Sequence, residues 1–297
     1  MRKYVIFTDS SCDLSLEERK AIGIWPTVFR QDIIFNDGVI NVDDPEDFYR
    51  RQETGEYAPG SLKTSSGSPD DVARILDDII ENCDKDTVIV YAGISPCMSE
   101  STANVVGSVL NEYAEKTGRR FVNIDTQSIS NGLATFLQYL AQYDGDDIED
   151  YGQKLGKHIV HLFTENDLSY SARSGRYNCI EQAATTVMGA LKLSPWLYFP
   201  GNNRLSMRKP CRRGRILGEW ADYYAKNVAP DNQFVRIGYG GEESRKMAEE
   251  LAQRLEKKGV NREQIQFAHV GPLIGVHTGP TVLSFFFKQK GERFKQK

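Results

Sequence analysis

The sequence lacks the cysteine pairs that make a disulfide framework or a structural zinc site. Its 297 residues hold five scattered cysteines, and none belongs to a Cys-x-x-Cys pair. Cys12 and Cys97 lie in expected loops, where either is a candidate reactive thiol. No His stands beside either cysteine in the sequence to act as the base of a nucleophile–base pair, so a cysteine-based enzyme is disfavoured.

The sequence also lacks a long apolar run and an excess of positive charge. The N-terminal stretch MRKYVIFTDSSCD has only a short apolar run, too short for a signal peptide or a membrane span. We therefore expect a cytoplasmic protein without stable membrane insertion. The net charge of −4 gives no global field that would attract nucleic acid. With 40% hydrophobic and 26% charged residues, the chain predicts a globular protein of one large or two ordinary domains.

Several motifs of nucleotide and hydrolytic enzymes are missing. There is no Gly-x-x-x-x-Gly-Lys-Ser/Thr phosphate loop, no Gly-x-Gly-x-x-Gly dinucleotide motif and no Gly-x-Ser-x-Gly elbow. No cluster of His and carboxylates has the spacing of metal ligands. We therefore expect no metal, no cofactor and no catalytic residue set.

Strand-length apolar runs alternate with helical periodicity in the first half of the chain. YVIF, TVIVYA and FVNI read as buried strands, with helices between them, which predicts a parallel sheet covered on both faces. After the polar break at residues 143–151, turn signals, extended runs and two long helical patterns predict an α+β unit. The predicted fold is α/β with two domains, a three-layer parallel-sheet domain at residues 1–155 and a two-layer α+β domain at residues 156–297.

Four loops are rich in small hydroxyl residues, and three of them directly follow the predicted strands. The four loops are TDSSCD, KTSSGSP, GISPCMSEST and DTQSISNG. Ligands of open α/β sheets gather at such loops, where helix N-termini converge. Ser68 and Pro69 account for one helix start, which leaves Thr64 and Ser65 without a structural task. Together these loops predict a bowl of donors that holds an anion rather than cleaves it.

The C-terminal half adds a histidine and a basic run. His277 lies between Gly275 and Gly279, and it is either a structural histidine or a donor to an anion that the small glycines allow to approach. Residues 204–215 hold six Arg and Lys, which form either a solvated surface or a docking surface for an acidic or nucleotide-bearing partner. The net charge and the lack of interleaved aromatics argue against nucleic acid.

These motifs, in this order, resemble those of the DegV family of bacterial fatty-acid-binding proteins. The matching residues are Asp9 to Asp13, Lys63-Thr64-Ser65 with Pro69, Ser99, Asp125 with Thr126, Ser130 and Gly132, Ser174-Gly175-Arg176, Leu191-Lys192 with Pro195, and His277 with Gly279 and Pro280. The chain departs from the family pattern where Glu100-Ser101-Thr102 follows Ser99, and where Thr281 follows Pro280.

The resemblance implies a long-chain fatty acid, palmitate-like, buried between the two domains. It implies that Thr64 and Ser99 hold the carboxylate, with the main-chain N–H of Ser65 and the ring of His277 as helpers. Weaker candidates for the same site are Ser95, Ser130 and Gly275. The protein would then be a carrier without a catalytic role of its own.

The resemblance further implies delivery of the bound acid to a separate ATP-dependent fatty acid kinase, for phospholipid synthesis. Candidate residues for docking such a partner are Arg176, Arg208, Arg212 and Arg213. Two other functions stay open at this point. One is an enzyme that acts on a small phosphorylated or keto substrate with His277 as acid–base. The other is an interaction module whose contact surface is residues 204–215.

Overall fold

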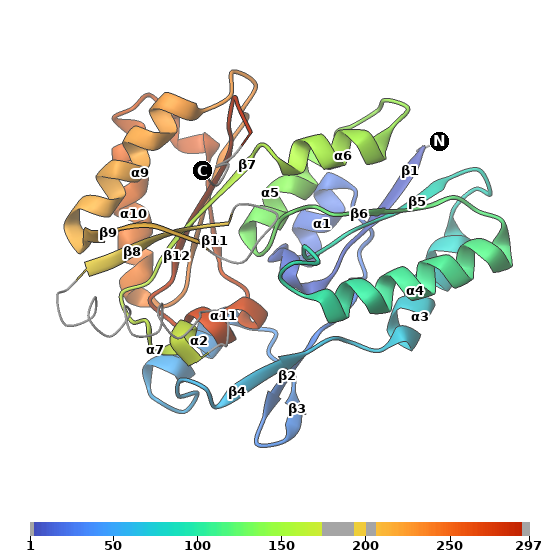
Figure 1. Ribbon diagram of the computed structural model, residues 1–297, viewed down its shortest axis with the longest axis horizontal. Helices are drawn as coiled ribbons and strands as arrows, with labels where there is room; N and C mark the ends of the chain where they lie inside the picture. The colour runs from blue at the N-terminus through green and yellow to red at the C-terminus, as the bar shows by residue number, and fades with distance from the viewer. Residues whose placement is uncertain (1–2, 174–192, 200–205, 293–297) are drawn as a thin grey trace. The chain divides into compact units, whose positions relative to one another are not determined.

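The computed structural model describes residues 3–173, 193–199 and 206–292, and contacts divide the chain into two compact units (Figure 1). The first unit comprises Met1–Asp32 and Ser65–Lys157, and the second comprises Ile33–Thr64 and His158–Lys297. The domain limits predicted above differ from this grouping in one respect, because residues 33–64 fall in the second unit.

The first unit is built on a parallel three-stranded sheet in the order β1-β5-β6. Its strands are β1 (Tyr4–Phe7), β5 (Val88–Ala92) and β6 (Phe121–Ile124), with Ile6 opposite Val90 and Val90 opposite Val122. The three apolar runs that the sequence shows are thus the three strands, as expected for a sheet covered on both faces.

Helices cover both faces of this sheet. They are α1 (Leu16–Ile22), α3 (Pro69–Asn82), α4 (Glu100–Thr117), α5 (Asn131–Leu140) and α6 (Ile148–Gly156), with a short 3-10 helix η1 (Ser10–Cys12). Ile75 of α3 and Val106 of α4 share a core cluster with Ile89 of β5. On the other face, α6 packs so closely on β6 that a Cβ at Gly152 would lie 2.9 Å from Ile124 Cδ1. The predicted three-layer arrangement is confirmed.

The second unit contains a six-stranded sheet in the order β11-β10-β12-β7-β8-β9. Only the pair β10–β11 is parallel, and the other neighbours are antiparallel. The strands are β7 (Ile159–Thr164), β8 (Leu193–Tyr198), β9 (Ser206–Arg212), β10 (Val235–Tyr239), β11 (Ile265–His269) and β12 (Leu283–Lys288). Side chains alternate along these strands, so β7 presents Val160 and Leu162 to one face and His161 and Phe163 to the other.

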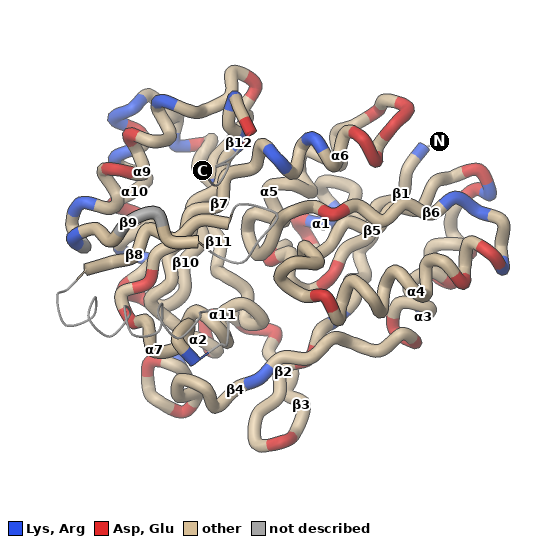
Figure 2. The backbone as a smooth tube through the Cα atoms, in the orientation of Figure 1, with Lys and Arg blue, Asp and Glu red and all other residues tan. Residues whose placement is uncertain are grey.

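The helices of the second unit are α2 (Pro45–Glu53), α7 (Ser169–Arg173), α9 (Arg213–Asn227), α10 (Glu242–Glu256) and α11 (Pro272–Thr278), with the 3-10 helix η2 (Arg262–Gln264). Trp220 of α9 and Leu251 of α10 share a buried core cluster with Phe285 of β12. Basic and acidic residues both occur along α9 and α10 (Figure 2). The predicted α+β character of this part is confirmed.

A small sheet in the order β3-β2-β4, in which β2 and β3 are antiparallel, completes the described strands. It consists of β2 (Asp32–Phe35), β3 (Gly38–Ile40) and β4 (Leu62–Ser65). The turn between β2 and β3 is made by Asn36 and Asp37, both with positive φ, a conformation that suits short hairpin connections. The sequence Asn36-Asp37-Gly38 is typical of such a turn. Among the described residues, no helix is long and apolar enough to span a bilayer.

Candidate functional site

Thr64 lies near the end of the short strand β4 in the second unit. Side chains two residues apart share a face of a strand, and Thr64 accordingly shares a face with the buried Leu62, while Lys63 and Ser65 are exposed. The Thr64 side chain is half-buried. The buried Leu62 thus fixes this face of the strand, and part of the Thr64 side chain is accessible to solvent.

His277 is the residue that Thr64 contacts. The distance between Thr64 Oγ1 and His277 Nε2 is 3.0 Å, which is a hydrogen bond. His277 lies in the last turn of α11 and is half-buried. The structure therefore brings together two of the four main predicted site residues.

The glycines around His277 serve packing inside the protein. A Cβ at Gly275 would lie 2.7 Å from Phe48 Cε1 and 2.7 Å from Tyr49 Oη, so α2 fills the space that the sequence analysis reserved for a ligand. Gly279 has φ 72 and lies against Tyr170, with 2.3 Å from a built Cβ to the ring. Both positions require glycine for close contact and, at Gly279, for backbone conformation.

Ser65 and Ser99 belong to the first unit. Ser65 Oγ donates to Asp32 Oδ2 at 3.2 Å. Ser99 is the N-cap residue of the 18-residue helix α4, yet its hydroxyl makes no capping hydrogen bond to the helix backbone. Instead, Ser99 Oγ donates to Thr102 Oγ1 at 2.8 Å. A helix start of this length, without a side-chain cap, is a favourable place for an anion.

The first-unit loops after β1 and β5 are joined by a buried carboxylate. Asp9 Oδ1 accepts from Ser11 N at 2.9 Å and from Ser11 Oγ at 2.5 Å. Asp9 Oδ2 accepts from Tyr91 Oη at 2.6 Å and from Ile94 N at 2.7 Å. Burial raises the pKa of Tyr91 well above its usual value, so it remains a phenol that donates. Four donors thus satisfy the carboxylate of Asp9, which makes it a structural group.

The two weaker serine candidates also donate to carboxylates of the protein. Ser95 Oγ donates to Asp125 Oδ1 at 2.9 Å, and Ser130 Oγ donates to Asp13 Oδ2 at 2.5 Å. Both serines are fully buried. Their presence in the predicted donor bowl stays a prediction, but their hydroxyl protons already have partners within the first unit.

The cysteines and the basic residues are less informative. Cys12 is buried, and burial raises the pKa of its thiol to about 12, which disfavours a reactive thiolate. Cys97 is exposed, with its Sγ 3.1 Å from Ser95 Oγ. Arg212 is an exposed residue at the end of β9, and the side chains of Arg208 and Arg213, like all of Arg176, lie outside the described part of the chain. The docking surface stays a prediction.

Two polar residues of the second unit were not predicted as site residues from the sequence. Glu165 follows β7 and is 1% exposed, and burial raises its pKa to about 8. Thr281, a departure from the family pattern, accepts from Asn166 N at 3.2 Å and from Asp167 N at 2.8 Å. No sequence pattern indicates that Glu165 is a buried carboxyl. At position 281, the departure from the family pattern could have indicated a residue with its own hydrogen-bonding role.

Other sites in the described part of the chain do not coincide with these residues. No group of three His, Cys, Asp or Glu residues there has the arrangement of a metal site. A groove of about 520 Å³ lies between α9 and α10, lined by Gly218, Ala221, Asp222, Glu250, Gln253, Arg254, Lys257 and Lys258. No predicted site residue lines it.

Comparison with known proteins supports the family resemblance. Residues 3–290 match the family described as uncharacterised protein, DegV family. A DegV domain-containing protein of Clostridium perfringens is 26% identical, with 97% of this chain and 98% of that protein covered. A second DegV domain-containing protein of the same organism is 25% identical over 94% of this chain and 96% of that protein. The chain belongs to the DegV family.

Solved structures have the same fold. A fatty-acid-binding DegV family protein from Thermus thermophilus matches with a TM-score of 0.77 at 22% identity, over 97% of this chain and 100% of that chain. A stearic acid-binding protein from Eubacterium ventriosum matches with a TM-score of 0.76 at 20% identity, over 97% and 98%. A DegV family protein from Eubacterium eligens, loaded with heptadecanoic acid, matches with a TM-score of 0.76 at 17% identity, over 97% and 100%. At these identities the likeness shows the fold.

Proposed function

We propose that this protein binds a long-chain fatty acid and holds its carboxylate with Thr64 and Ser99, assisted by the main-chain N–H of Ser65 and the ring of His277. The single observation that carries the proposal is the hydrogen bond of 3.0 Å between Thr64 Oγ1 and His277 Nε2. The pair comes from sequence positions 64 and 277, at the two motifs that the family resemblance selects. The location of the acid between the two domains stays a prediction.

The chemistry of the Thr64–His277 pair suits a carboxylate. A threonine hydroxyl and a protonated imidazole both donate hydrogen bonds, and a carboxylate accepts up to four. Hydrogen bonds to a charged group contribute about 1.5–3 kcal/mol each. Ser99, at the start of α4, adds a helix N-terminus, which favours an anion by about 0.3–2 kcal/mol. These contributions orient the head group and discriminate against uncharged lipids.

The apolar tail supplies most of the binding free energy. Burial of a methylene contributes about 0.8 kcal/mol, so a ~16-carbon chain offers on the order of 12 kcal/mol before ordering costs. The solved relatives that hold stearic and heptadecanoic acid are proteins of the same fold. This likeness supports a ligand with a long tail.

The test is the lipid content of the purified protein. Denaturing extraction followed by mass spectrometry is expected to release a long-chain acid in roughly equimolar amount. In the double variant Thr64→Val, Ser99→Ala, loss of two hydrogen bonds to a charged group lowers affinity by about 10-fold or more per residue. We therefore expect the extract to hold little acid while the circular dichroism spectrum is unchanged.

A matched control distinguishes an effect on the proposed site from a general effect of a Thr→Val substitution. Thr54 follows α2 in the same unit and is exposed, with its Oγ1 donating to Arg51 O at 3.2 Å. Thr54→Val makes the same chemical change away from His277 and is expected to retain the lipid. Equal lipid content in the double variant and in the wild-type protein would refute the proposed site.

We further propose that the protein presents the acid to a separate ATP-dependent fatty acid kinase. Support comes from the sequence, which contains no phosphate-binding loop of its own. The test is acyl-phosphate formation from the protein-bound acid when candidate kinases of the same organism and ATP are added. Formation by the isolated protein alone would contradict this role.

One observation favours a second function. A hydroxyl 3.0 Å from an imidazole nitrogen also has the geometry of a nucleophile–base or acid–base pair. An enzyme acting on a small phosphorylated or keto substrate would show turnover by the isolated protein that His277→Ala abolishes. A carrier would show none, and the same variant would only lose lipid.

A further inference from the structure

The position of His277 depends on contacts from outside its own helix. The helix α11 has only seven residues, and isolated helices of that length are unstable in water. Packing must therefore hold α11 in place, and whatever holds it also sets the place of the His277 ring. Two helices of the second unit, α7 and α2, pack against α11, and Gln52 of α2 donates a hydrogen bond to its backbone.

Three residues of α2 contact the segment that contains α11. Phe48 and Tyr49 occupy the space beside Gly275, within 2.7 Å of where a Cβ would lie. Tyr49 Oη donates to Val270 O, two residues before α11 begins, at 2.8 Å. Gln52 Nε2 donates to Gly275 O at 2.9 Å. These contacts fix α11 at its start and in its middle.

Gln52 differs from the other two because helix formation does not require its hydrogen bond. Gly275 O already accepts from Gly279 N at 2.9 Å, within the helix end. Gln52 is 4% exposed, and its Oε1 has no hydrogen-bond partner in the part of the chain that the structure describes. A buried amide with an unsatisfied oxygen is costly. A methionine of similar size would fill the place without that cost, so the donor is the useful part of Gln52.

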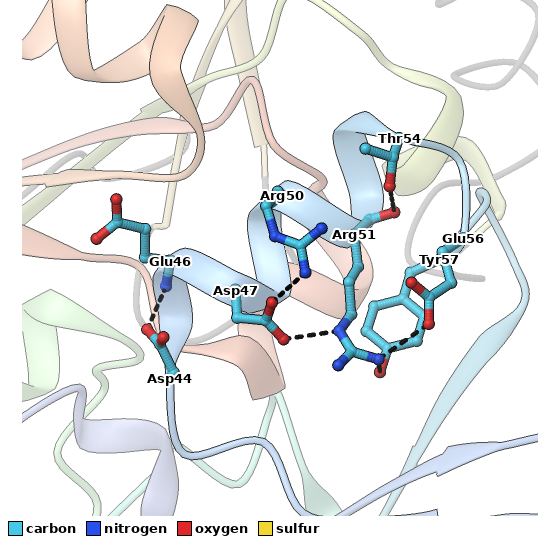
Figure 3. A network of polar contacts seen from close by, with 8 residues as sticks. All are labelled: Asp44, Glu46, Asp47, Arg50, Arg51, Thr54, Glu56 and Tyr57. Atoms are coloured by element: carbon cyan, nitrogen blue, oxygen red, sulfur yellow. Dashed lines mark hydrogen bonds and ion pairs between the residues drawn. The ribbon is translucent and has the colours of Figure 1, made fainter.

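The opposite side of α2 carries ion pairs between residues of the helix itself, as Figure 3 shows. Asp47 accepts from Arg50 and from Arg51, and these bonds lower its pKa, while Arg51 Nη1 donates to Glu56 Oε1 at 2.9 Å. At the end of α2, Glu53 Oε1 accepts from Glu242 N at 3.0 Å, at the start of α10. Gln52 therefore extends from a helix that has its own ion pairs and is bonded at its end to the start of α10.

We propose that Gln52 is a positioning residue for the carboxylate site, which holds the last turn of α11 so that His277 Nε2 meets Thr64 Oγ1. The proposal rests on the proposed function for its ligand, but the placement of His277 is measurable without any ligand. The hydrogen bond that Gln52 donates goes to the backbone of α11. Its effect passes through Gly275, two residues before His277.

The first variant is Gln52→Met, which keeps the volume and removes the donor. Loss of one net hydrogen bond corresponds to about a 2- to 10-fold change in an equilibrium, so we expect fatty-acid affinity to fall by about that factor. In the lipid-free protein, the ring resonances of His277 are expected to shift, because the Thr64–His277 hydrogen bond changes. A purely structural role would lower the melting temperature and leave those resonances in place.

The second variant is Gln52→Glu, which provides a rescue that depends on pH. A protonated carboxyl can donate to Gly275 O, whereas an ionised one cannot. Burial raises the pKa of such a carboxyl, so the ratio of variant to wild-type affinity is expected to rise as pH falls from 8 to 5. The Gln52→Glu variant also tests the proposal if Gln52→Met does not fold.

The matched control is Gln289→Met. Gln289 is 5% exposed in the same unit, and its side chain bonds to Tyr223 Oη and Gly291 O, both at 2.9 Å. It is expected to leave affinity and the His277 resonances unchanged. Wild-type affinity and unshifted His277 resonances in Gln52→Met would overturn the positioning role. Absence of fatty-acid binding by the wild-type protein would instead refute the proposed function, while the resonances still test the placement.

Discussion

The two units satisfy their buried polar groups to different degrees. In the first unit, Asp9 accepts four hydrogen bonds, and Ser95 and Ser130 each donate to a protein carboxylate. In the second unit, Glu165 is equally buried, but its Oε2 has no hydrogen-bond partner among the described residues. There, the Thr64 hydroxyl meets an imidazole instead of a carboxylate.

This difference separates structural hydroxyls from candidate ligand hydroxyls. A hydroxyl has one proton to donate, and a serine that already gives it to a buried aspartate gains little from an added carboxylate. Thr64 contacts an imidazole, and Ser99 contacts another hydroxyl. An anion can replace either partner as the acceptor of the hydroxyl proton. In the first unit, the hydroxyls of Ser11, Ser95 and Ser130 therefore belong to internal hydrogen bonds.

The largest expected effect is loss of the Asp9 carboxylate. Asp9→Ala leaves Tyr91 Oη and Ile94 N without their buried acceptor. Removal of a buried, multiply bonded charge costs about 3–5 kcal/mol. Urea unfolding is expected to show that decrease in the free energy of unfolding. Asp86→Ala, at an exposed position in the same unit, should stay within about 0.5 kcal/mol of wild type, and an equal effect of both changes would contradict the structural role of Asp9.

The next effect concerns Glu165 and depends on pH. Burial, with a smaller contribution from Asp167, raises the pKa of Glu165 from 4.5 to about 8, against a hydrogen bond with Ser171 that lowers it. Between these values the unfolded chain has lost the proton that the folded protein keeps. Unfolding then releases a proton, so the stability that Glu165 contributes is complete below the unfolded pKa and decreases as pH rises towards 8.

Glu165→Gln removes this dependence. Relative to the variant, the wild-type free energy of unfolding is expected to fall by several kcal/mol, to order of magnitude, between about pH 5 and pH 8. Urea unfolding of both proteins across that range measures it. Glu263→Gln, at an exposed position of the same unit, should follow the wild-type pH profile. A constant difference between wild type and Glu165→Gln would show that Glu165 titrates normally.

Gly275→Ala tests whether the glycine beside His277 serves packing. A Cβ there would meet Phe48 and Tyr49 at 2.7 Å, and such overpacking costs about 1–3 kcal/mol. We expect a lower melting temperature together with loss of bound lipid, because α11 moves. Gly214→Ala in α9 has no heavy atom within 4 Å of the new Cβ and should stabilise by up to about 1 kcal/mol. Normal stability with lost lipid would instead mean that a ligand approaches Gly275.

Much of the fold was predictable because local patterns and tertiary structure agree. The run YVIF and the two later apolar runs became the three parallel strands, and Ser68 caps α3 by accepting from Asp70 N at 3.1 Å, with Pro69 at its first position. The grouping of residues 33–64 with the second unit was not predictable. It rests on contacts such as Tyr49 with Val270, whose partners are more than 200 positions apart.

The site was predictable only in part, because some of its contacts join residues that are far apart in the sequence. The motif order selected Thr64 and His277, whose contact the structure shows. Sequence patterns could not reveal that Gly275 receives the ring of Phe48, because the partner of a glycine is set by tertiary packing. Nor could they show that Ser95 donates to Asp125, since hydroxyls before a helix look alike whether they bind a ligand or the protein.

The smallest expected effect on the ligand is that of Ser95→Ala, and it probes the contrast between the units directly. Ser95 Oγ donates to Asp125 Oδ1, an oxygen that also accepts from Gln127 N at 2.9 Å. Because that acceptor keeps a partner, stability should fall by only about 1 kcal/mol. Extraction and mass spectrometry should find lipid within about 2-fold of wild type, since the lost hydrogen bond is internal. A loss as large as that of Thr64→Val would mean that the Ser95 hydroxyl turns from Asp125 to the carboxylate, and that the first unit contributes more than Ser65 and Ser99 to the site.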